Sequence, residues 1–286
     1  MIPVLDGFDL IAPASLDEAL RILASDRDAR PFAGGTDLMV VLEAGHLTPG
    51  RYVSLWAIRE LHGIARDDRG GLVLNALTSF SEIRESPLVA DAFPMLALAA
   101  REIGGIATQN RATIGGNIAN ASPAADSPPA LLAYDAEIEL LSIRGRRRMP
   151  YGDFHTGYKK MRLEPGEIVA RVVLPSRQVG WRDGYRKVGT RRAQAISKVC
   201  LAASVLMDGD DVADVRLALG SIAPTVVRCR AAEDAVRRRT LSEEVIANAT
   251  RAVLTDIAPI DDIRSTAQYR SAVAQNLVAA FLRDSL

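Results

Sequence analysis

The sequence predicts a protein of mixed helix and sheet, an α+β fold, built from two domains. The chain has 286 residues, which is long for a single domain. Apolar residues make up 48% of it, enough for a sizeable core. The first half alternates strand-like and helix-like segments, whereas the second half places strand-like runs before its helices.

The first half is expected to begin with a helix. Ser15 followed three residues later by Glu18 is typical of a capping box, and apolar residues at helical spacing continue to Leu23. A short strand over 30–33 enters a glycine pair, and a short helix over 37–43 follows and ends near Gly45. The remaining elements of this half are expected to be strands over 52–55, 72–77, 136–142 and 167–175, and helices over 94–101 and 128–133.

A polar segment with two glycines, residues 176–184, marks the predicted domain boundary. The expected domains are 1–176, with sub-lobes of about 1–55 and 56–176, and 177–286. The second domain should contain strands over 185–188, 196–207 and 212–219, with a turn at 208–211, and helices that begin at Ser242 and Tyr269.

Two glycine pairs about eighty residues apart are the main functional signal. The first lies in Ala33-Gly34-Gly35-Thr36-Asp37, and the second in Thr113-Ile114-Gly115-Gly116-Asn117-Ile118-Ala119-Asn120. Adjacent glycines permit positive φ angles and let backbone N–H groups approach phosphate oxygens. The pairs therefore predict a grip on the diphosphate of a dinucleotide. The alternatives are ordinary tight turns, and polar side chains that cap helices or close Asx turns.

Other functional classes have little support. The chain lacks GxGxxG, GxxxxGK[ST] and GxSxG, which argues against a Rossmann dinucleotide site, a P-loop and a nucleophile elbow. Basic and acidic residues number 35 each, so binding of nucleic acid by net charge is not expected. The arginine runs 146–148 and 237–239 are interpreted as solvated faces or turns. No acid–base pair indicates a catalytic residue.

Cysteine and histidine usage argues against a metal centre in this chain. Cys200 and Cys229 cannot supply the four thiolates of an iron–sulfur cluster, and His46, His62 and His155 are scattered. A surface or packing role is expected for each histidine. The chain has no stretch of eighteen apolar residues and no signal-peptide pattern, so a cytoplasmic protein without a membrane span is expected.

Several motifs together resemble the FAD-binding (medium) subunit of molybdenum hydroxylases, the xanthine dehydrogenase and carbon monoxide dehydrogenase family. The motifs run in order over nearly the whole chain and lie at 33–38, 112–119, 122–126, 154–158, 163–168 and 187–198. The resemblance implies a vanillyl-alcohol-oxidase-like (PCMH-type) FAD-binding domain. A smaller α+β C-terminal domain of the CO dehydrogenase flavoprotein type is implied to follow it.

The resemblance also implies non-covalent FAD and a set of cofactor-binding residues. By similarity, the diphosphate is held on one side by Ala33, Gly34, Gly35 and Thr36 and on the other by Thr113, Gly116, Asn117 and Asn120. The neighbouring residues Phe32, Asp37 and Gly115 are also expected to bind the cofactor. Asp126 is expected at the adenosine half, and Val169 and Lys187 near the flavin and adenine regions. Arg191 and Arg192 either act electrostatically on the flavin or belong to an exposed charged hairpin.

The implied function is that of an electron-transfer subunit. Molybdopterin and two [2Fe–2S] clusters would reside in a large and a small partner subunit, and electrons would leave the FAD to NAD⁺ or another acceptor. A xanthine dehydrogenase type is favoured, while carbon monoxide, nicotinate-like heterocycles and aryl-CoA thioesters stay open as substrates. The alternatives are a stand-alone flavin oxidase and a nucleotide-binding scaffold that has lost its flavin.

Overall fold

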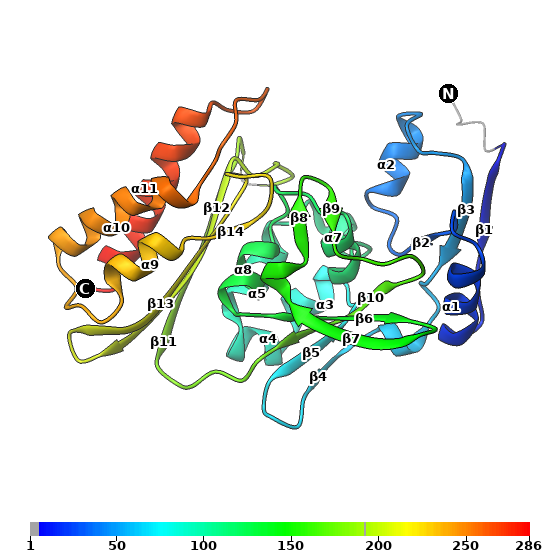
Figure 1. The fold of residues 1–286 in the computed structure, drawn as a ribbon, viewed down its shortest axis with the longest axis horizontal. Coiled ribbons are helices and arrows are strands. Elements are labelled where there is room, and N and C mark those ends of the chain that lie inside the picture. Colours follow the sequence, from blue (N-terminus) through cyan, green and yellow to red (C-terminus); the bar gives the residue numbers. More distant parts are fainter. Residues whose placement is uncertain (1–5, 192) are drawn as a thin grey trace.

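The computed structural model describes residues 6–191 and 193–286, which form an α+β fold with three principal sheets (Figure 1). The first sheet is parallel, with the order β1-β3-β2. Its strands are β1 (Phe8–Ile11), β2 (Arg30–Phe32) and β3 (Gly50–Ser54), and its helices are α1 (Leu16–Ser25) and α2 (Leu38–Glu43).

The predicted capping of α1 is confirmed at its serine. The Ser15 hydroxyl accepts from the Glu18 N–H, while the Glu18 carboxylate accepts from Ala14 instead of from Ser15. The apolar face of α1 is buried against this lobe. Helix α2 differs, because none of its residues is buried, although all but the last are apolar.

The second sheet is antiparallel and lies at the centre of the molecule, with the order β4-β5-β10-β6-β7. The strands are β4 (Ile64–Arg66), β5 (Leu72–Asn75), β6 (Glu137–Ser142), β7 (Gly145–Pro150) and β10 (Ile168–Leu174). The associated helices are α3 (Phe80–Glu85), α4 (Pro87–Ala92), α5 (Pro94–Glu102), α6 (Ile106–Gln109), α7 (Ile114–Ala119) and α8 (Pro128–Ala133), with one-turn helices η1 (Arg59–Leu61) and η2 (Tyr151–Asp153). A small hairpin of β8 (His155–Gly157) and β9 (Lys160–Met161) lies beside α7 (Figure 1).

The third sheet is antiparallel, with the order β11-β12-β13-β14, and helices cover one of its faces (Figure 1). The strands are β11 (Trp181–Val188), β12 (Val199–Asp208), β13 (Asp211–Gly220) and β14 (Val227–Arg228), and the helices are α9 (Arg230–Val236), α10 (Glu243–Asp256) and α11 (Ala267–Arg283). The order of strands before helices in this half is confirmed. Its other face contributes Ala202 and Ala218 to the core cluster of the central sheet.

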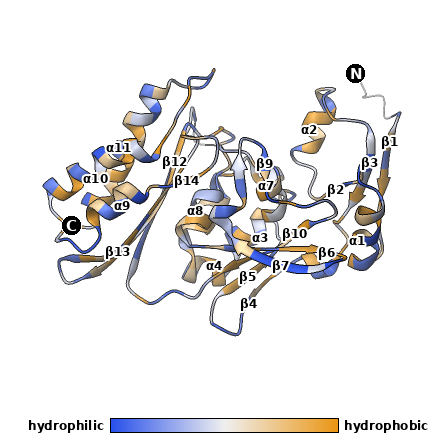
Figure 2. Cartoon of the chain, in the orientation of Figure 1, coloured by the Kyte–Doolittle hydropathy of each residue, from blue (hydrophilic) through white to orange (hydrophobic). Residues whose placement is uncertain are grey.

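Two segments that carry sequence predictions lie in strands. Residues 181–184 of the polar boundary segment already belong to β11. The arginine run 146–148 lies in β7, which Figure 2 shows as hydrophilic, and Arg146 and Arg148 are exposed, in agreement with the expected solvated face. Its arginines form ion pairs with Glu139 and Glu167, whose side chains are only 5% exposed.

Candidate functional site

The first glycine pair lies in the loop between β2 and α2, as expected. Gly35 has a φ of 78°, in the left-handed region where glycine is favoured. A Cβ atom on Gly34 would lie 1.7 Å from the Arg111 carbonyl oxygen, so only glycine fits against that backbone. Within the described part of the chain, the N–H groups of residues 34–37 donate to no protein acceptor. This loop therefore presents free backbone donors.

The second glycine pair is not a tight turn, and the expectation of a second bend with exposed amides is wrong. Gly115 and Gly116 lie in the first turn of α7, and neither has a positive φ. Their N–H groups donate to the Ala76 carbonyl oxygen at 2.8 Å and to the Thr113 hydroxyl at 3.1 Å. A Cβ atom on Gly115 would lie 2.6 Å from that of Ala76. This glycine is required because α7 packs closely on the end of β5.

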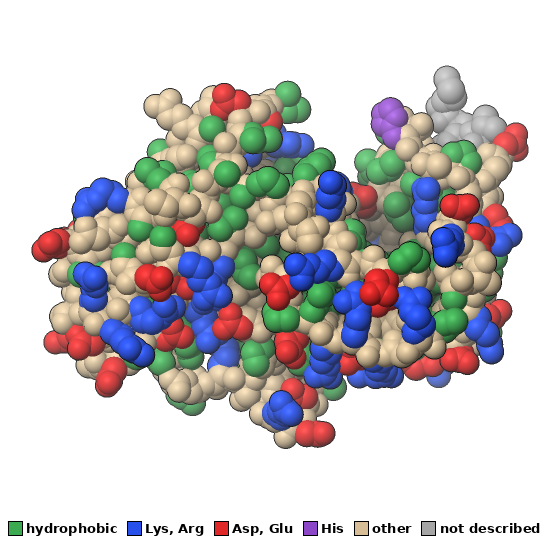
Figure 3. Space-filling view, viewed as in Figure 1, with side chains coloured by type: hydrophobic (Ala, Val, Ile, Leu, Met, Phe, Trp, Pro, Cys, Tyr) green, Lys and Arg blue, Asp and Glu red, His purple; other side chains and the backbone are tan. Residues whose placement is uncertain are grey.

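The two segments nevertheless meet in one place. They line a cavity of about 350 Å³ between the lobe that carries α2 and the central domain, where the surface is hollowed in Figure 3. The predicted residues on its wall are Ala33, Gly34, Gly35, Thr36, Asp37, Thr113, Gly115, Gly116, Asn117, Asn120 and Val169. The fold thus brings together residues far apart in the sequence.

Polar side chains connect the walls of this cavity. The Asn120 amide donates to Asp37 Oδ1 at 3.1 Å, and this bond joins α7 to the loop before α2. Asn117 Oδ1 accepts from the Ser127 hydroxyl at 2.7 Å, which fixes the orientation of its amide. Thr113 is the N-cap of α7, whereas Asp37, one of the residues considered as a cap, holds the N-cap position of α2 but makes no capping bond.

Asp126 and Lys187 lie apart from this cavity. Asp126 lines a second cavity of about 420 Å³, whose wall also includes residues 104–108 and 194–196. Lys187 lines neither cavity but donates to Asp126 Oδ2 at 2.7 Å and to the Glu102 carbonyl oxygen at 2.8 Å. One segment of the chain connects the two cavities, because residues 104–108 line the second cavity and residues between 112 and 120 line the first.

The carboxyl group of Asp126 is the most polar group of the second cavity and is almost completely buried. Burial raises its pKa to about 6, although Lys187 acts in the opposite direction. Within the described residues, Asp126 Oδ1 accepts no hydrogen bond. The Ser197 hydroxyl is likewise buried without a partner and acts on the Asp126 carboxyl to lower its pKa, so it is the donor within the protein that is available to this carboxyl group.

The other predicted groups take positions outside the cavities. Phe32 lies beneath the loop, with its ring against Gly35. Arg191 is exposed and donates to the carbonyl oxygens of Ala193 and Gln194, while Arg192 lies outside the described residues. Cys200 and Cys229 are buried, and burial raises the pKa of both thiols.

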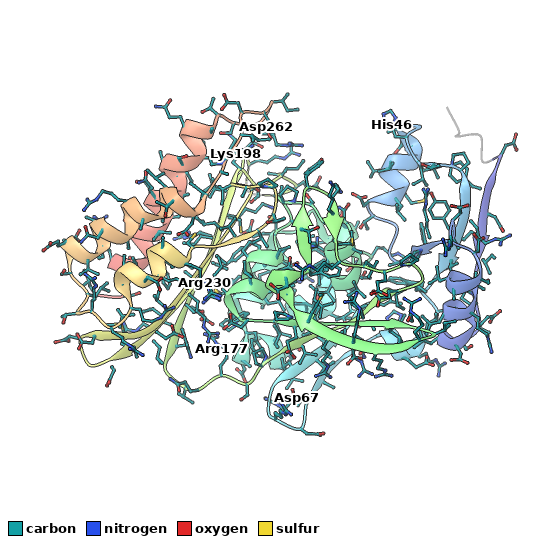
Figure 4. All side chains as sticks on the ribbon, in the orientation of Figure 1. His46, Asp67, Arg177, Lys198, Arg230 and Asp262 are labelled. Atoms are coloured by element: carbon teal, nitrogen blue, oxygen red, sulfur yellow. The ribbon has the colours of Figure 1, made fainter. Side chains whose placement is uncertain are left out.

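The histidines make packing contacts or lie at the surface. His46 lies beyond the end of α2 and is exposed (Figure 4), whereas His62 Nε2 contacts the Trp56 carbonyl oxygen. His155 Nε2 lies 2.9 Å from the Ile118 carbonyl oxygen and ties the β8–β9 hairpin to α7. Among the described residues, no three histidine, cysteine or acidic side chains form a group suited to a metal ion. None of the described helices is long and apolar enough to span a bilayer.

Sequence reasoning missed part of the first cavity wall. The missed lining residues are Pro31, Leu38, Leu55, Ala76, Leu77, Ala112, Ala119, Lys159, Met161, Leu163, Glu167 and Ile168. Lys159 is the one lining residue with a positive charge. Its place depends on the docking of the β8–β9 hairpin on α7, and the motif at 154–158, which ends just before Lys159, does not by itself predict this docking.

Comparisons with known proteins agree with this architecture. Residues 6–177 match the family described as FAD binding domain in molybdopterin dehydrogenase, and residues 184–285 match the CO dehydrogenase flavoprotein C-terminal domain. The chain is 32% identical to a putative xanthine dehydrogenase FAD-binding subunit of Escherichia coli (strain K12), over 96% of this chain and 94% of that protein.

Relatives that act on other substrates are similarly close. The chain is 30% identical to the carbon monoxide dehydrogenase medium chain of Hydrogenophaga pseudoflava, over 95% of this chain and 94% of that protein. A solved structure of carbon monoxide dehydrogenase from that organism, described as lacking the Mo-pyranopterin moiety of its cofactor, aligns with a TM-score of 0.93. It has 31% identity and covers 98% of this chain and 96% of the matched chain.

Proposed function

Because the chain belongs to the family of FAD-binding subunits of molybdenum hydroxylases, we propose that it holds FAD as an electron-transfer subunit. In this proposal, electrons arrive from [2Fe–2S] clusters of a small partner subunit, and a large partner subunit carries the molybdopterin centre and the organic substrate site. The electrons then leave the FAD to NAD⁺ or another acceptor. A xanthine dehydrogenase type is favoured.

The observation that carries the proposal is the cavity wall formed by the β2–α2 loop. Residues 34–37 line a cavity that α7 also lines, and their N–H groups have no acceptor among the described residues. Gly34 lies so close to Arg111 that a side chain would not fit. Such a group of backbone donors suits the oxygens of a diphosphate. The Asp126 carboxyl group lines the second cavity and suits a donor group elsewhere on the same molecule. The residues present therefore fit FAD.

The roles of individual residues follow from their positions. Residues 34–37 would bind the diphosphate, and Asn117 and Asn120 would offer amide groups from α7. Asp126, held by Lys187, would accept from the adenosine half, and Val169 would contribute an apolar contact. The bound flavin supplies the redox chemistry, and the protein positions it and shields it from water.

The partner assignment follows from ligand chemistry. A [2Fe–2S] cluster typically needs four thiolates, and this chain offers two cysteines whose thiols are buried and hard to ionise. Any cluster that passes electrons to this FAD must then belong to another subunit. We take residues 1–176 as the FAD-holding domain and 177–286 as the domain that closes the second cavity and supplies Lys187.

An anaerobic titration tests this proposal. The purified chain should bind FAD with one-to-one stoichiometry, and xanthine added afterwards should leave the oxidised flavin spectrum unchanged. After chemical reduction of the bound flavin, NAD⁺ should restore the oxidised spectrum. Reduction of the flavin by xanthine in the absence of partner subunits would contradict the assignment as a relay and would support a stand-alone oxidase.

A further inference from the structure

Lys159 occupies an unusual position for a lysine. It lies in the turn between β8 and β9 with a φ of 55°, in the left-handed region that is unfavourable for a residue with a Cβ atom. Glycine or asparagine would adopt this conformation more easily. An unfavourable backbone conformation at the edge of a binding cavity is a reason to ask what the side chain does there.

The side chain of Lys159 reaches from the hairpin to the C-terminal end of α7. Its Nζ atom donates to the Asn120 backbone oxygen at 2.8 Å and also to the Asn120 side-chain oxygen. Asn120 in turn donates to Asp37 at 3.1 Å, so three separate segments meet at the cavity. An ammonium group has three N–H donors, and within the described residues the third donor of Lys159 has no acceptor.

Among the described residues that line the cavity, two are acidic and one is basic. Asp37 and Glu167 line it, and only Glu167 is neutralised by a close ion pair, with Arg147 at 2.7 Å. A diphosphate would bring two further negative charges next to Asp37. The backbone donors of residues 34–37 carry no net charge, and among the described lining residues Lys159 is the cation. Lys159 and Asp37 are both exposed to solvent, so the attraction of Lys159 for an anion is strongest at low salt.

We propose that Lys159 is a binding residue for the diphosphate of FAD, with its free N–H directed at a phosphate oxygen and its two bonds to Asn120 holding it in place. This inference rests on the proposed function and adds to it the charged group that balances the cofactor. Lysine commonly serves as a point-charge partner of phosphate groups.

Flavin binding by the full, flavin-free chain tests this role. Dissociation constants for FAD and for riboflavin, which has no phosphate, are measured from flavin fluorescence at low and at high salt. Lys159→Asn removes the charge but suits the left-handed turn, and Lys159→Arg keeps the charge. Lys160→Asn is the matched control, because Lys160 is the adjacent exposed lysine and does not line the cavity.

We expect Lys159→Asn to raise the dissociation constant for FAD by roughly ten- to a hundredfold at low salt, typical of the loss of a charge-assisted hydrogen bond. The loss should shrink at high salt, because ions screen the attraction. Riboflavin binding should not change, Lys159→Arg should restore most of the FAD affinity, and Lys160→Asn should behave as wild type.

Two results would overturn the inference while leaving the proposed function intact. The first is wild-type FAD affinity in Lys159→Asn at both salt concentrations. The second is an equal loss of FAD and riboflavin, since that would mean that Lys159 only shapes the hairpin. Circular dichroism of each variant without flavin shows whether it is folded. A wild-type chain that binds no FAD would instead defeat the proposed function itself.

Discussion

The side chain of Asp126 has a pKa that burial raises and that Lys187 lowers. Its pKa is raised from 3.8 to about 6, mainly by burial. Between these values the unfolded chain releases the proton while the folded chain keeps it. This group therefore lowers the free energy of unfolding as pH rises through that window, and its contribution is constant above about 6.

Binding of FAD should have the opposite pH dependence. The ionised carboxylate of Asp126 is an acceptor in the wall of the second cavity, and the adenosine half of FAD has hydroxyl and amino donors. We expect FAD affinity to rise as pH increases through about 6 and to level off near neutrality. Below that pKa, the change should be up to about tenfold per pH unit. Fluorescence titrations from mildly acidic to neutral pH measure this profile.

Asp126→Asn should make the profile nearly flat, because an amide does not titrate. Asp153→Asn, at an exposed carboxylate, serves as the control and should keep the wild-type profile. If Asp126→Asn retained the wild-type dependence on pH, Asp126 would not be the group that controls binding.

Among single residues, the sequence could predict those candidate binding residues that lie together in one short segment of the chain. The loop at Gly34 and Gly35 could be predicted because its strand, glycine pair and helix are contiguous. Lys159 could not, because its role depends on a hairpin that docks on α7 through His155 and Ile118. Lys187, which donates to Asp126, was a candidate binding residue through family resemblance and not through any local pattern.

Residues of α7 line the first cavity, but their glycine pair was predicted to form a bend and instead lies in a helix. A glycine pair in sequence is compatible with a turn and with close packing, and only the neighbours decide between them. Here the backbone of Gly115 contacts Ala76, which follows β5 by one position. The strand pairing that brings Ala76 there is a long-range feature, so single-sequence reasoning could not supply it.

Gly115→Ala tests this packing role. Alanine favours a helix over glycine by about 1 kcal/mol, so propensity alone predicts a more stable protein. The added Cβ would lie 2.6 Å from the Ala76 Cβ and 2.8 Å from its carbonyl oxygen, which forces α7 to move. We expect a net loss of about 1–3 kcal/mol in the free energy of unfolding, measured by chemical denaturation.

Gly157→Ala is the matched control for this change. The nearest atom to its added Cβ is Lys160 Cδ at 3.8 Å, which is an ordinary contact. Its free energy of unfolding should stay within about 0.5 kcal/mol of wild type. Should Gly115→Ala prove as stable as wild type, close packing would not explain the glycine.

Short elements were the ones that sequence reasoning overlooked. Strands β1, β4, β8, β9 and β14 have two to four residues each, too few for an alternating pattern to be visible. Strand β7 was missed for another reason, since its arginines obscured the pattern. They pair with the buried carboxylates of Glu139 on β6 and of Glu167, which directly precedes β10, and this compensation is invisible in the local sequence.

At the scale of the whole molecule, polar contacts join the central sheet to the C-terminal sheet. The Tyr134 hydroxyl accepts from the Met95 N–H and donates to Asp183, each at 2.9 Å. Arg177, labelled in Figure 4, forms two parallel bonds to Asp183 at 2.7 and 2.8 Å. Bidentate pairs of this kind give geometric specificity. The strand that carries Lys187 is thereby held against the domain that carries Asp126.

The mixed fold and the order of its elements could be predicted because the spacing of apolar residues indicates helices and long strands. The arrangement of the sheets could not, since it depends on which strands pair across the chain. The same long-range pairing creates the cavity between α2 and α7. The family could therefore be predicted from the ordered series of motifs, whereas the cavity that these motifs line becomes visible only in the folded structure.

The most direct test of the account is a crystal structure of the chain grown with FAD. The account predicts that the diphosphate oxygens lie within hydrogen-bonding distance of the backbone N–H groups of residues 34–37, in the cavity opposite α7. A bound FAD whose diphosphate lies elsewhere, with those N–H groups facing only water, would contradict it.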